Sequence, residues 1–342
     1  MIQTKNGWQI FLENKEKWNS FVVKSEGQFR QLFEWGEFKK KLGWDVLRVA
    51  FYENDEFVSC TQILLRKKLF LSYIYIPGGI NGDLNKLDIN FINFIKKETN
   101  SFFLYFRFDF VQDHSEKFIQ NFKKMKLTRP SYIMHNGKFF ILNLSKNNEE
   151  LLKEAKQKWR YHHKRSQKKD NNFFVEKNSD HFIDNEKELS KLRNHRNLYN
   201  KREVTPLIEE LGEKLVVCVS KDSNGNLLAL RSVVLLGDTA WHLNSSVNSK
   251  GRNYLSGYSL LMKTIETCRE KGIKNYNLGG INIDRFPGPY KFKMGIAQEK
   301  NLKNTLGEWE YSNPFFLKIF FNYGIKLYFH SSYILSKIFK NL

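Results

Sequence analysis

A lysine near the C-terminal end of the chain stands in the sequence context best suited to chemistry. Lys293 and the preceding Phe292 follow Gly288-Pro289, and a strand-like segment ending in Gly279-Gly280 comes shortly before them. Glycine has no Cβ, so the backbone at such a turn is able to approach a ligand closely. Proline restricts the turn that precedes the aromatic ring and the ammonium group. We therefore expect Phe292 and Lys293 at the mouth of a cleft.

A carboxylate marks a second candidate site. Asp109 follows the almost wholly apolar segment 102–108, which we expect to be a buried strand ending at Asp109. The end of a core strand is a common place for a site residue in folds built from strands and helices. The alternative is structural, because Arg107 lies two residues earlier on the same side of the strand and would form a salt bridge with Asp109.

Two predicted helices combine aromatic rings with positive charge. Lys39 lies one helical turn after Trp35, so both side chains share a face that suits a sugar and a phosphate; a solvated face of lysines is the alternative. In the predicted helix 185–200, Arg196 takes a position in a stripe of inward residues that includes Tyr199. An inward arginine suggests a bound anion, and an internal salt bridge is the alternative.

The segment 156–169 carries seven Lys or Arg, two His and no acidic residue, with Trp159 and Tyr161 between them. Such a run predicts contact with a polyanion, through phosphates that position a nucleic acid without reading its sequence. A solvated basic helix is the alternative. The residues that we expect to contact RNA are Arg160, Lys164, Arg165, Lys168 and Lys169.

The end of the chain is also basic and aromatic. Segment 315–342 contains nine aromatic residues, four lysines and no acidic residue. An amphipathic helix of this composition would lie on an anionic membrane, or pack its aromatic face against the first domain. Upstream, residues 252–257 lead into a predicted helix whose N-terminus would bind phosphate.

Composition sets the outer limits of these interpretations. The 342 residues are 41% hydrophobic, enough for two domains with their own cores. The net charge of +20 predicts attraction to RNA, anionic lipid or diphosphates without choosing among them. The three cysteines lie far apart without metal-ligand spacing, which is typical of reduced cytoplasmic thiols. We see neither a secretion signal nor an apolar run that would span a bilayer, and expect a cytoplasmic protein.

The elements that must position these residues repeat along the chain. In each half we expect an antiparallel meander, then a helix and one more strand, giving mixed, mostly antiparallel sheets flanked by helices. The first copy comprises strands 45–52, 57–65 and 73–76, helix 84–98 and strand 102–108. The second comprises strands 214–220, 227–236 and 239–243, helix 255–271 and strand 274–278.

Several motifs follow one another in the order found in the Fem-type (FemABX) family, the aminoacyltransferases that build peptidoglycan cross-bridges. They are Trp35-Gly36-Glu37-Phe38-Lys39, Gln62-Ile63-Leu64-Leu65-Arg66, Tyr75-Ile76-Pro77-Gly78-Gly79, Phe106-Arg107-Phe108-Asp109 and Tyr276-Asn277-Leu278-Gly279-Gly280 with the later Phe292-Lys293. The chain resembles the short members of this family, which lack a coiled-coil arm. Leu243-Asn244-Ser245-Ser246 resembles the family's turn after a central strand. The resemblance implies two tandem GNAT-like acyltransferase domains, residues 1–145 and 146–313, with the helix 314–342 packing on the first.

The resemblance also implies roles for the candidate residues. Trp35, Lys39, Arg196 and Tyr199 would bind the precursor and its diphosphate, Asp109 would hold or deprotonate the attacking amine, and the basic segment would support the tRNA acceptor stem. Lys293 would stabilise the oxyanion of the reaction, with Phe292 shaping the cleft. The chain departs from the family pattern at Phe110, where proline is usual, and at Met294-Gly295-Ile296-Ala297-Gln298, where a second lysine is common.

The function implied by the resemblance is transfer of an amino acid from aminoacyl-tRNA to the stem-peptide amine of lipid II or UDP-MurNAc-pentapeptide. We expect a monomer, and a reaction that needs neither cofactor nor metal because aminolysis of an ester is downhill. One alternative keeps the fold but uses acyl-coenzyme A to acylate an amine in envelope polysaccharide synthesis. Another is a catalytically silent RNA-binding or membrane-surface protein.

Overall fold

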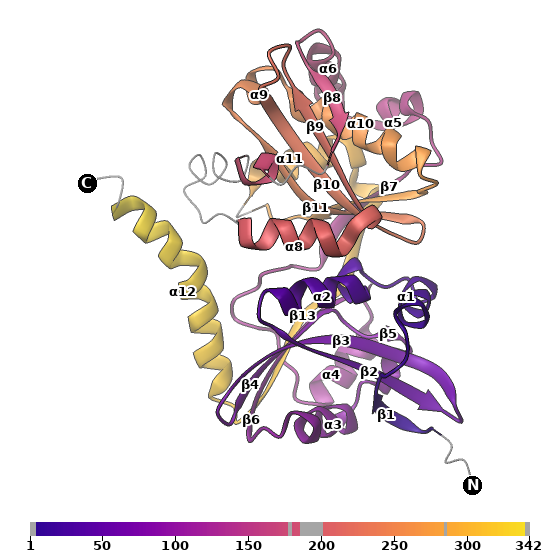
Figure 1. Ribbon diagram of the computed structural model, residues 1–342, viewed down its shortest axis with the longest axis vertical. Coiled ribbons are helices and arrows are strands. Elements are labelled where there is room, and N and C mark those ends of the chain that lie inside the picture. Colours follow the sequence, from indigo (N-terminus) through magenta and orange to yellow (C-terminus); the bar gives the residue numbers. More distant parts are fainter. Residues whose placement is uncertain (1–4, 177–179, 185–200, 284–285, 339–342) are drawn as a thin grey trace. The chain divides into compact units, whose positions relative to one another are not determined.

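The computed structural model describes residues 5–176, 180–184, 201–283 and 286–338. The chain divides into unit 1, Met1–Gly137 with Asn304–Tyr328, and unit 2, Lys138–Lys303 with Phe329–Leu342. Figure 1 labels the helices and strands of both units. None of the helices in the described ranges is both long and apolar enough to cross a membrane.

The sheet of unit 1 is mostly antiparallel, and one crossover makes a parallel pair. In spatial order its strands are β1 (Gly7–Ile10), β2 (Asp45–Glu53), β3 (Glu56–Lys68), β4 (Leu71–Gly78), β6 (Phe103–Asp113) and β13 (Leu302–Asn313), with β5 (Asn81–Gly82) beside β3. β2 and β3 form a hairpin because Asn54 and Asp55 accept the positive φ values, 48° and 69°, that its tight turn requires. Helix α3 (Ile89–Thr99) connects β4 to the parallel β6.

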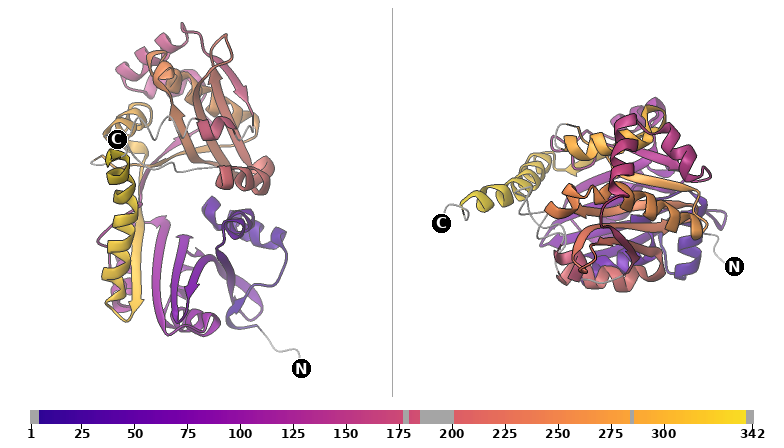
Figure 2. Two further views of the ribbon diagram at one scale, coloured as in Figure 1. Left: turned by 60° about the vertical axis from the view of Figure 1, so that its left-hand side comes forward. Right: turned by 90° about the horizontal axis from the view of Figure 1, so that it is seen from above.

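The two faces of this sheet carry different residues. Alternate residues of β6, among them Phe106, Phe108 and Phe110, form one core with α3 and α4 (Glu116–Lys124). The intervening residues Tyr105, Arg107 and Asp109 point to the opposite face, since side chains of a strand alternate. There the start of α12 (Leu317–Ile338) runs beside the sheet, as Figure 2 shows. The ring of Phe321 lies 4.5 Å from that of Tyr105.

Unit 2 repeats the same order of elements. Its strands are, in spatial order, β7 (Lys138–Asn143), β12 (Asn275–Gly280), β11 (Thr239–Val247), β10 (Leu227–Leu236), β9 (Leu215–Lys221) and β8 (Asn172–Val175). Helix α10 (Ser256–Glu270) connects β11 to the parallel β12. One face packs on α5 (Asn148–Glu154), α6 (Gln157–Ser166), α10 and α11 (Pro287–Ala297), while α8 (Lys201–Leu211) lies across the strands in Figure 1.

The predicted fold class is confirmed, including the repeated unit of meander, helix and strand. Two local predictions are wrong. The strand β6 does not end at Asp109 but continues to Asp113, because β13 pairs with it from Thr305 to Asn313. Segment 243–246 is not a turn, since β11 stays bonded to β10 as far as Val247 opposite Ala229.

Candidate functional site

Lys293 lies on α11, a helix that begins with prolines. Pro287 takes the first helical position, where its missing N–H would have no partner in any case. Phe292 and Lys293, which we expected just after a proline-bearing turn, therefore lie on a helix that begins at that proline-bearing segment. The Lys293 ammonium donates hydrogen bonds to the carbonyl oxygens of Gly279 and Gly280, at 3.2 and 2.8 Å.

The glycine turn after β12 has a steric reason. Gly279 has a φ of +77°, which favours glycine, and a Cβ there would lie 2.7 Å from Cδ2 of His242. Its N–H is fixed by the Asn277 side chain at 2.7 Å. The predicted close approach at Gly279-Gly280 is therefore to His242 and Lys293 of the same unit.

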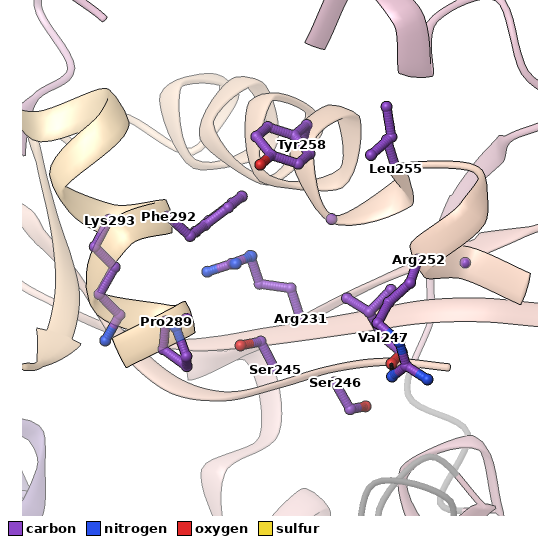
Figure 3. Close-up of a pocket in the computed structure, with 13 residues that line it drawn as sticks. Arg231, Ser245, Ser246, Val247, Arg252, Leu255, Tyr258, Pro289, Phe292 and Lys293 are labelled. Carbon is purple, nitrogen blue, oxygen red and sulfur yellow. Dashed lines mark hydrogen bonds between the residues drawn. The ribbon is translucent and has the colours of Figure 1, made fainter. Parts of the chain in front are cut away.

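A cavity of about 440 Å³ opens beside Lys293. It lies between the end of β11, the start of α10 and the first turns of α11, and Figure 3 shows its lining side chains. Tyr258 and Phe292 form an aromatic wall, their ring centroids 5.1 Å apart. Among the described residues that line the cavity, three are cationic, Arg231, Arg252 and Lys293, and none is acidic.

Arg231 is the least expected of these residues. It lies in β10, is 6% exposed, and forms no ion pair with a carboxylate of the described ranges. Its Nε has no hydrogen-bond partner among the described residues. Figure 3 shows the guanidinium reaching into the space between Phe292 and Pro289. A buried guanidinium without a carboxylate is costly unless an anion accompanies it, so the cavity favours an anionic ligand.

The electrostatics of this region point the same way. Burial, and then the charge of Arg231, lower the pKa of Lys293 to about 7. Burial and the charges of Arg231 and Lys293 also lower the pKa of His242, so this imidazole stays neutral at pH 7. An anion bound between Arg231 and Lys293 would relieve the repulsion between them and raise the pKa of Lys293.

Helix α6 holds α11 in place and presents positive charge. Trp159 and His163 are buried on its inner side, and the Trp159 ring lies 5.9 Å from that of Phe292. Lys164 and Arg165 are exposed on the helix, and Lys168 and Lys169 are exposed just after it. Arg160 is exposed too, but it also donates hydrogen bonds to the carbonyl oxygens of Lys153 and Ala155 at the end of α5.

In unit 1, Asp109 belongs to a buried polar cluster. It is 4% exposed and lies 3.2 Å from Arg30 and 3.3 Å from Nδ1 of His135. Burial raises the pKa of Asp109, with Glu308 adding to the effect and His135 and Arg30 opposing it. Arg107 does not pair with Asp109, the alternative weighed from the sequence, but with Glu308 at 2.5 Å.

The predicted aromatic and lysine pair of α2 (Phe33–Lys41) has two different environments. Lys39 is half-buried, its Nζ 4.9 Å from the Trp35 ring and 4.5 Å from the Phe38 ring. Trp35 is buried against Phe29 and Phe38 and therefore leaves little exposed ring surface for a sugar. Its ring instead contacts the Lys39 ammonium. Arg196 and Tyr199 lie outside the described residues.

The sequence interpretation missed Arg231, Arg30, His135 and Glu308. A signal existed for Arg231, since it is the one charged residue in the apolar run Leu227–Leu236. Glu308 shares β13 with Lys303 and Glu310, so its sequence context offers no such signal. Arg30 lies in the short 3₁₀ helix Phe29–Gln31 and His135 in a loop, and nothing local distinguishes them from solvated residues.

No family model matches the sequence, and no curated protein matches it. Solved structures do. FemX superposes with a TM-score of 0.76 at 16% identity, over 90% of this chain and 99% of that one. L-PGS from Bacillus licheniformis gives 0.53 at 13% identity, over 90% and 93%. A tandem GNAT protein from the clavulanic acid biosynthesis pathway gives 0.50 at 8% identity, over 89% and 98%. The chain therefore has the α+β fold of FemX and of tandem GNAT proteins.

Proposed function

We propose that this protein is an aminoacyltransferase that carries an amino acid from aminoacyl-tRNA to the stem-peptide amine of a peptidoglycan precursor, either lipid II or UDP-MurNAc-pentapeptide. The observation that carries the proposal is the cavity of unit 2, where Lys293 and the buried Arg231 offer two cations beside an aromatic wall, as an anionic donor would require. The likeness of the fold to FemX supports it.

The reaction has one bond to form and one to break. The acceptor amine attacks the ester carbonyl carbon, and the negative charge moves to the carbonyl oxygen. Collapse of this intermediate forms the amide and releases the terminal ribose hydroxyl of the tRNA, which takes up the proton that the amine loses. An ammonium held beside the oxyanion lowers the barrier because it acts where charge develops.

Each candidate residue then has a physical task. Lys293 lies on helix α11, and the carbonyl oxygens of Gly279 and Gly280 hold its ammonium in place. This ammonium supplies the positive charge for the oxyanion. Phe292 shields it from water. Asp109, whose raised pKa makes it a better base, would take the proton from the amine. Lys39 would bind the diphosphate of the precursor, and Lys164, Arg165, Lys168 and Lys169 the phosphates of the tRNA.

Lys293→Ala should lower kcat by roughly a hundredfold to a thousandfold, because one preorganised group that stabilises an oxyanion has about this effect. Lys291→Ala is the matched control, an exposed lysine two residues earlier on the same helix. Transfer would be measured as radiolabelled amino acid moved from tRNA to the precursor. A folded Lys293→Ala variant with near-normal turnover would show that this lysine is not catalytic.

A second candidate function rests on the start of α10. Leu255 and Gly257 line the cavity at this helix N-terminus, a position suited to a phosphate of acyl-coenzyme A. The donor is therefore tested directly, by supplying aminoacyl-tRNA and acyl-coenzyme A separately with the same acceptor. Transfer from acyl-coenzyme A without tRNA would replace the proposed function by the coenzyme A-dependent one.

A further inference from the structure

Three turns bring large apolar side chains to the surface at one end of the sheet of unit 1. They are the β3–β4 hairpin turn, the turn between α3 and β6, and the segment between β13 and α12. Their register places them together, since Leu71 lies opposite Phe103 and Leu104 lies opposite Asn313. Figure 1 shows the ends of β4 and β6 and the start of α12 at this same end.

We call this surface the apolar end and define it by six residues that are between 60% and 81% exposed. They are Leu69, Phe70, Phe102, Phe315, Phe316 and Phe320. The rings of Phe70 and Phe102 lie 5.9 Å apart, so the hairpin turn and the turn before β6 share one apolar surface. Exposed apolar surface gathered in this way, unlike scattered single residues, indicates a contact with another partner or with lipid.

The hairpin turn is unfavourable as it stands in water. Its two residues, Leu69 and Phe70, lie between the paired Lys68 and Leu71. Two-residue hairpin turns favour glycine or asparagine where the backbone adopts positive φ. Leu69 has a φ of 53° and is 81% exposed, so packing against the described residues does little to offset this conformation. A ligand that buries Leu69 and Phe70 would offset the cost of this turn.

Lysines surround the apolar end. Lys67 and Lys68 immediately precede the hairpin turn. Lys67 donates a hydrogen bond of 2.8 Å to the Thr99 carbonyl at the end of α3. Lys96 and Lys97 occupy the last turn of α3. Glu98 is the one acidic residue of the segments 66–70, 96–103, 123–126 and 315–327.

This combination selects among classes of partner. Protein interfaces are depleted in lysine at their cores, whereas aromatic side chains ringed by lysines match the boundary between acyl chains and anionic headgroups. We propose that the apolar end docks unit 1 on the surface of an anionic phospholipid bilayer. Its phenyl rings would lie below the lipid phosphates, and its lysines would contact those phosphates. The proposal does not depend on the proposed catalytic function.

Vesicle flotation with the full-length protein tests this docking. It should bind vesicles of equal parts phosphatidylglycerol and phosphatidylcholine, and bind phosphatidylcholine alone weakly. The triple variant Phe70→Ser/Phe102→Ser/Phe316→Ser should lower the partition coefficient at least about tenfold through lost apolar burial. Leu12→Ser, which removes an 87% exposed leucine from another segment, should leave it unchanged.

The charges are tested in parallel. Lys96→Gln/Lys97→Gln should lower the partition coefficient about tenfold, and Lys24→Gln/Lys271→Gln, the same change of charge elsewhere, should have a smaller effect. Binding that is unaffected by the serine variant would show attraction by the whole basic surface and would overturn the proposal. So would an absence of binding to anionic vesicles, or a concentration-dependent dimer in sedimentation that the serine variant abolishes.

Discussion

At the scale of single residues, the candidate donor site is defined by two cations in an apolar wall. Burial and the charge of Arg231 lower the pKa of Lys293, and no described acidic side chain lines their cavity. Such an arrangement is unfavourable in the empty protein and becomes favourable when an anion enters, since the anion pairs with both. The two cations thus lower the stability of the empty protein and raise its affinity for a negatively charged donor or transition state.

The lowered pKa of Lys293 predicts how activity depends on pH. If the ammonium is the active form, kcat/KM should fall as pH rises through about 7, because the free enzyme loses this proton there. Lys293→Arg keeps its charge, so the ratio of wild-type to variant kcat/KM should fall over the same range. Titration of the acceptor amine cancels in that ratio. A ratio that rises with pH would identify the neutral amine of Lys293 as a base.

At the scale of elements, the sequence predicts what is local. The apolar and polar patterns of single segments identified the strands and helices of both repeats, including β10, β12 and α10. The β6–β13 pairing, which extends β6 beyond Asp109, joins residues some two hundred positions apart and leaves no local signal. For the same reason the partners of Asp109 were not predictable, since Arg30 and His135 reach it from separate segments.

The contact between α6 and α11 positions the Phe292-Lys293 pair. Gly295 lies on the Trp159 ring, and a Cβ at this position would come within 2.6 Å of Cδ1 of Trp159. The Gly295 carbonyl also accepts a hydrogen bond of 2.7 Å from the N–H of Lys156. A glycine here therefore allows the two helices to approach closely, which a sequence pattern alone does not reveal.

Gly295→Ala should displace α11 from α6 and so misplace Lys293. We expect a destabilisation of about 1–3 kcal/mol, typical of overpacking, and a clear loss of kcat from the shifted ammonium. Chemical denaturation and steady-state kinetics would measure both. Gly324→Ala is the control, because its Cβ would meet no atom within 4 Å. Trp159→Phe should partly restore activity to Gly295→Ala, and an alanine variant with unchanged kcat would contradict this positioning role.

At the scale of the whole molecule, an excess of positive charge serves two different kinds of surface. The net charge of +20 attracts any polyanion. The lysines around the apolar end of unit 1 accompany aromatic side chains. The basic residues on α6 and just after it have no comparable apolar surface among the described residues. The first combination suits lipid, and the second suits the phosphates of an RNA, so separate substitutions should separate the two activities.

The salt dependence of tRNA binding tests the second surface. Each phosphate neutralised by a lysine or arginine releases close to one counterion, so log K should fall linearly with log salt concentration. Replacing Lys164, Arg165, Lys168 and Lys169 by Gln should lower the affinity and reduce the slope by up to about four units, roughly one for each lost contact.

The control carries the same change of charge in unit 1, at Lys24, Lys68, Lys123 and Lys124, and should alter the slope far less. Fluorescence anisotropy between low and moderate salt measures both. An equal loss of slope in the two variants would mean that tRNA is attracted by the net charge alone, and α6 would then be an ordinary solvated helix.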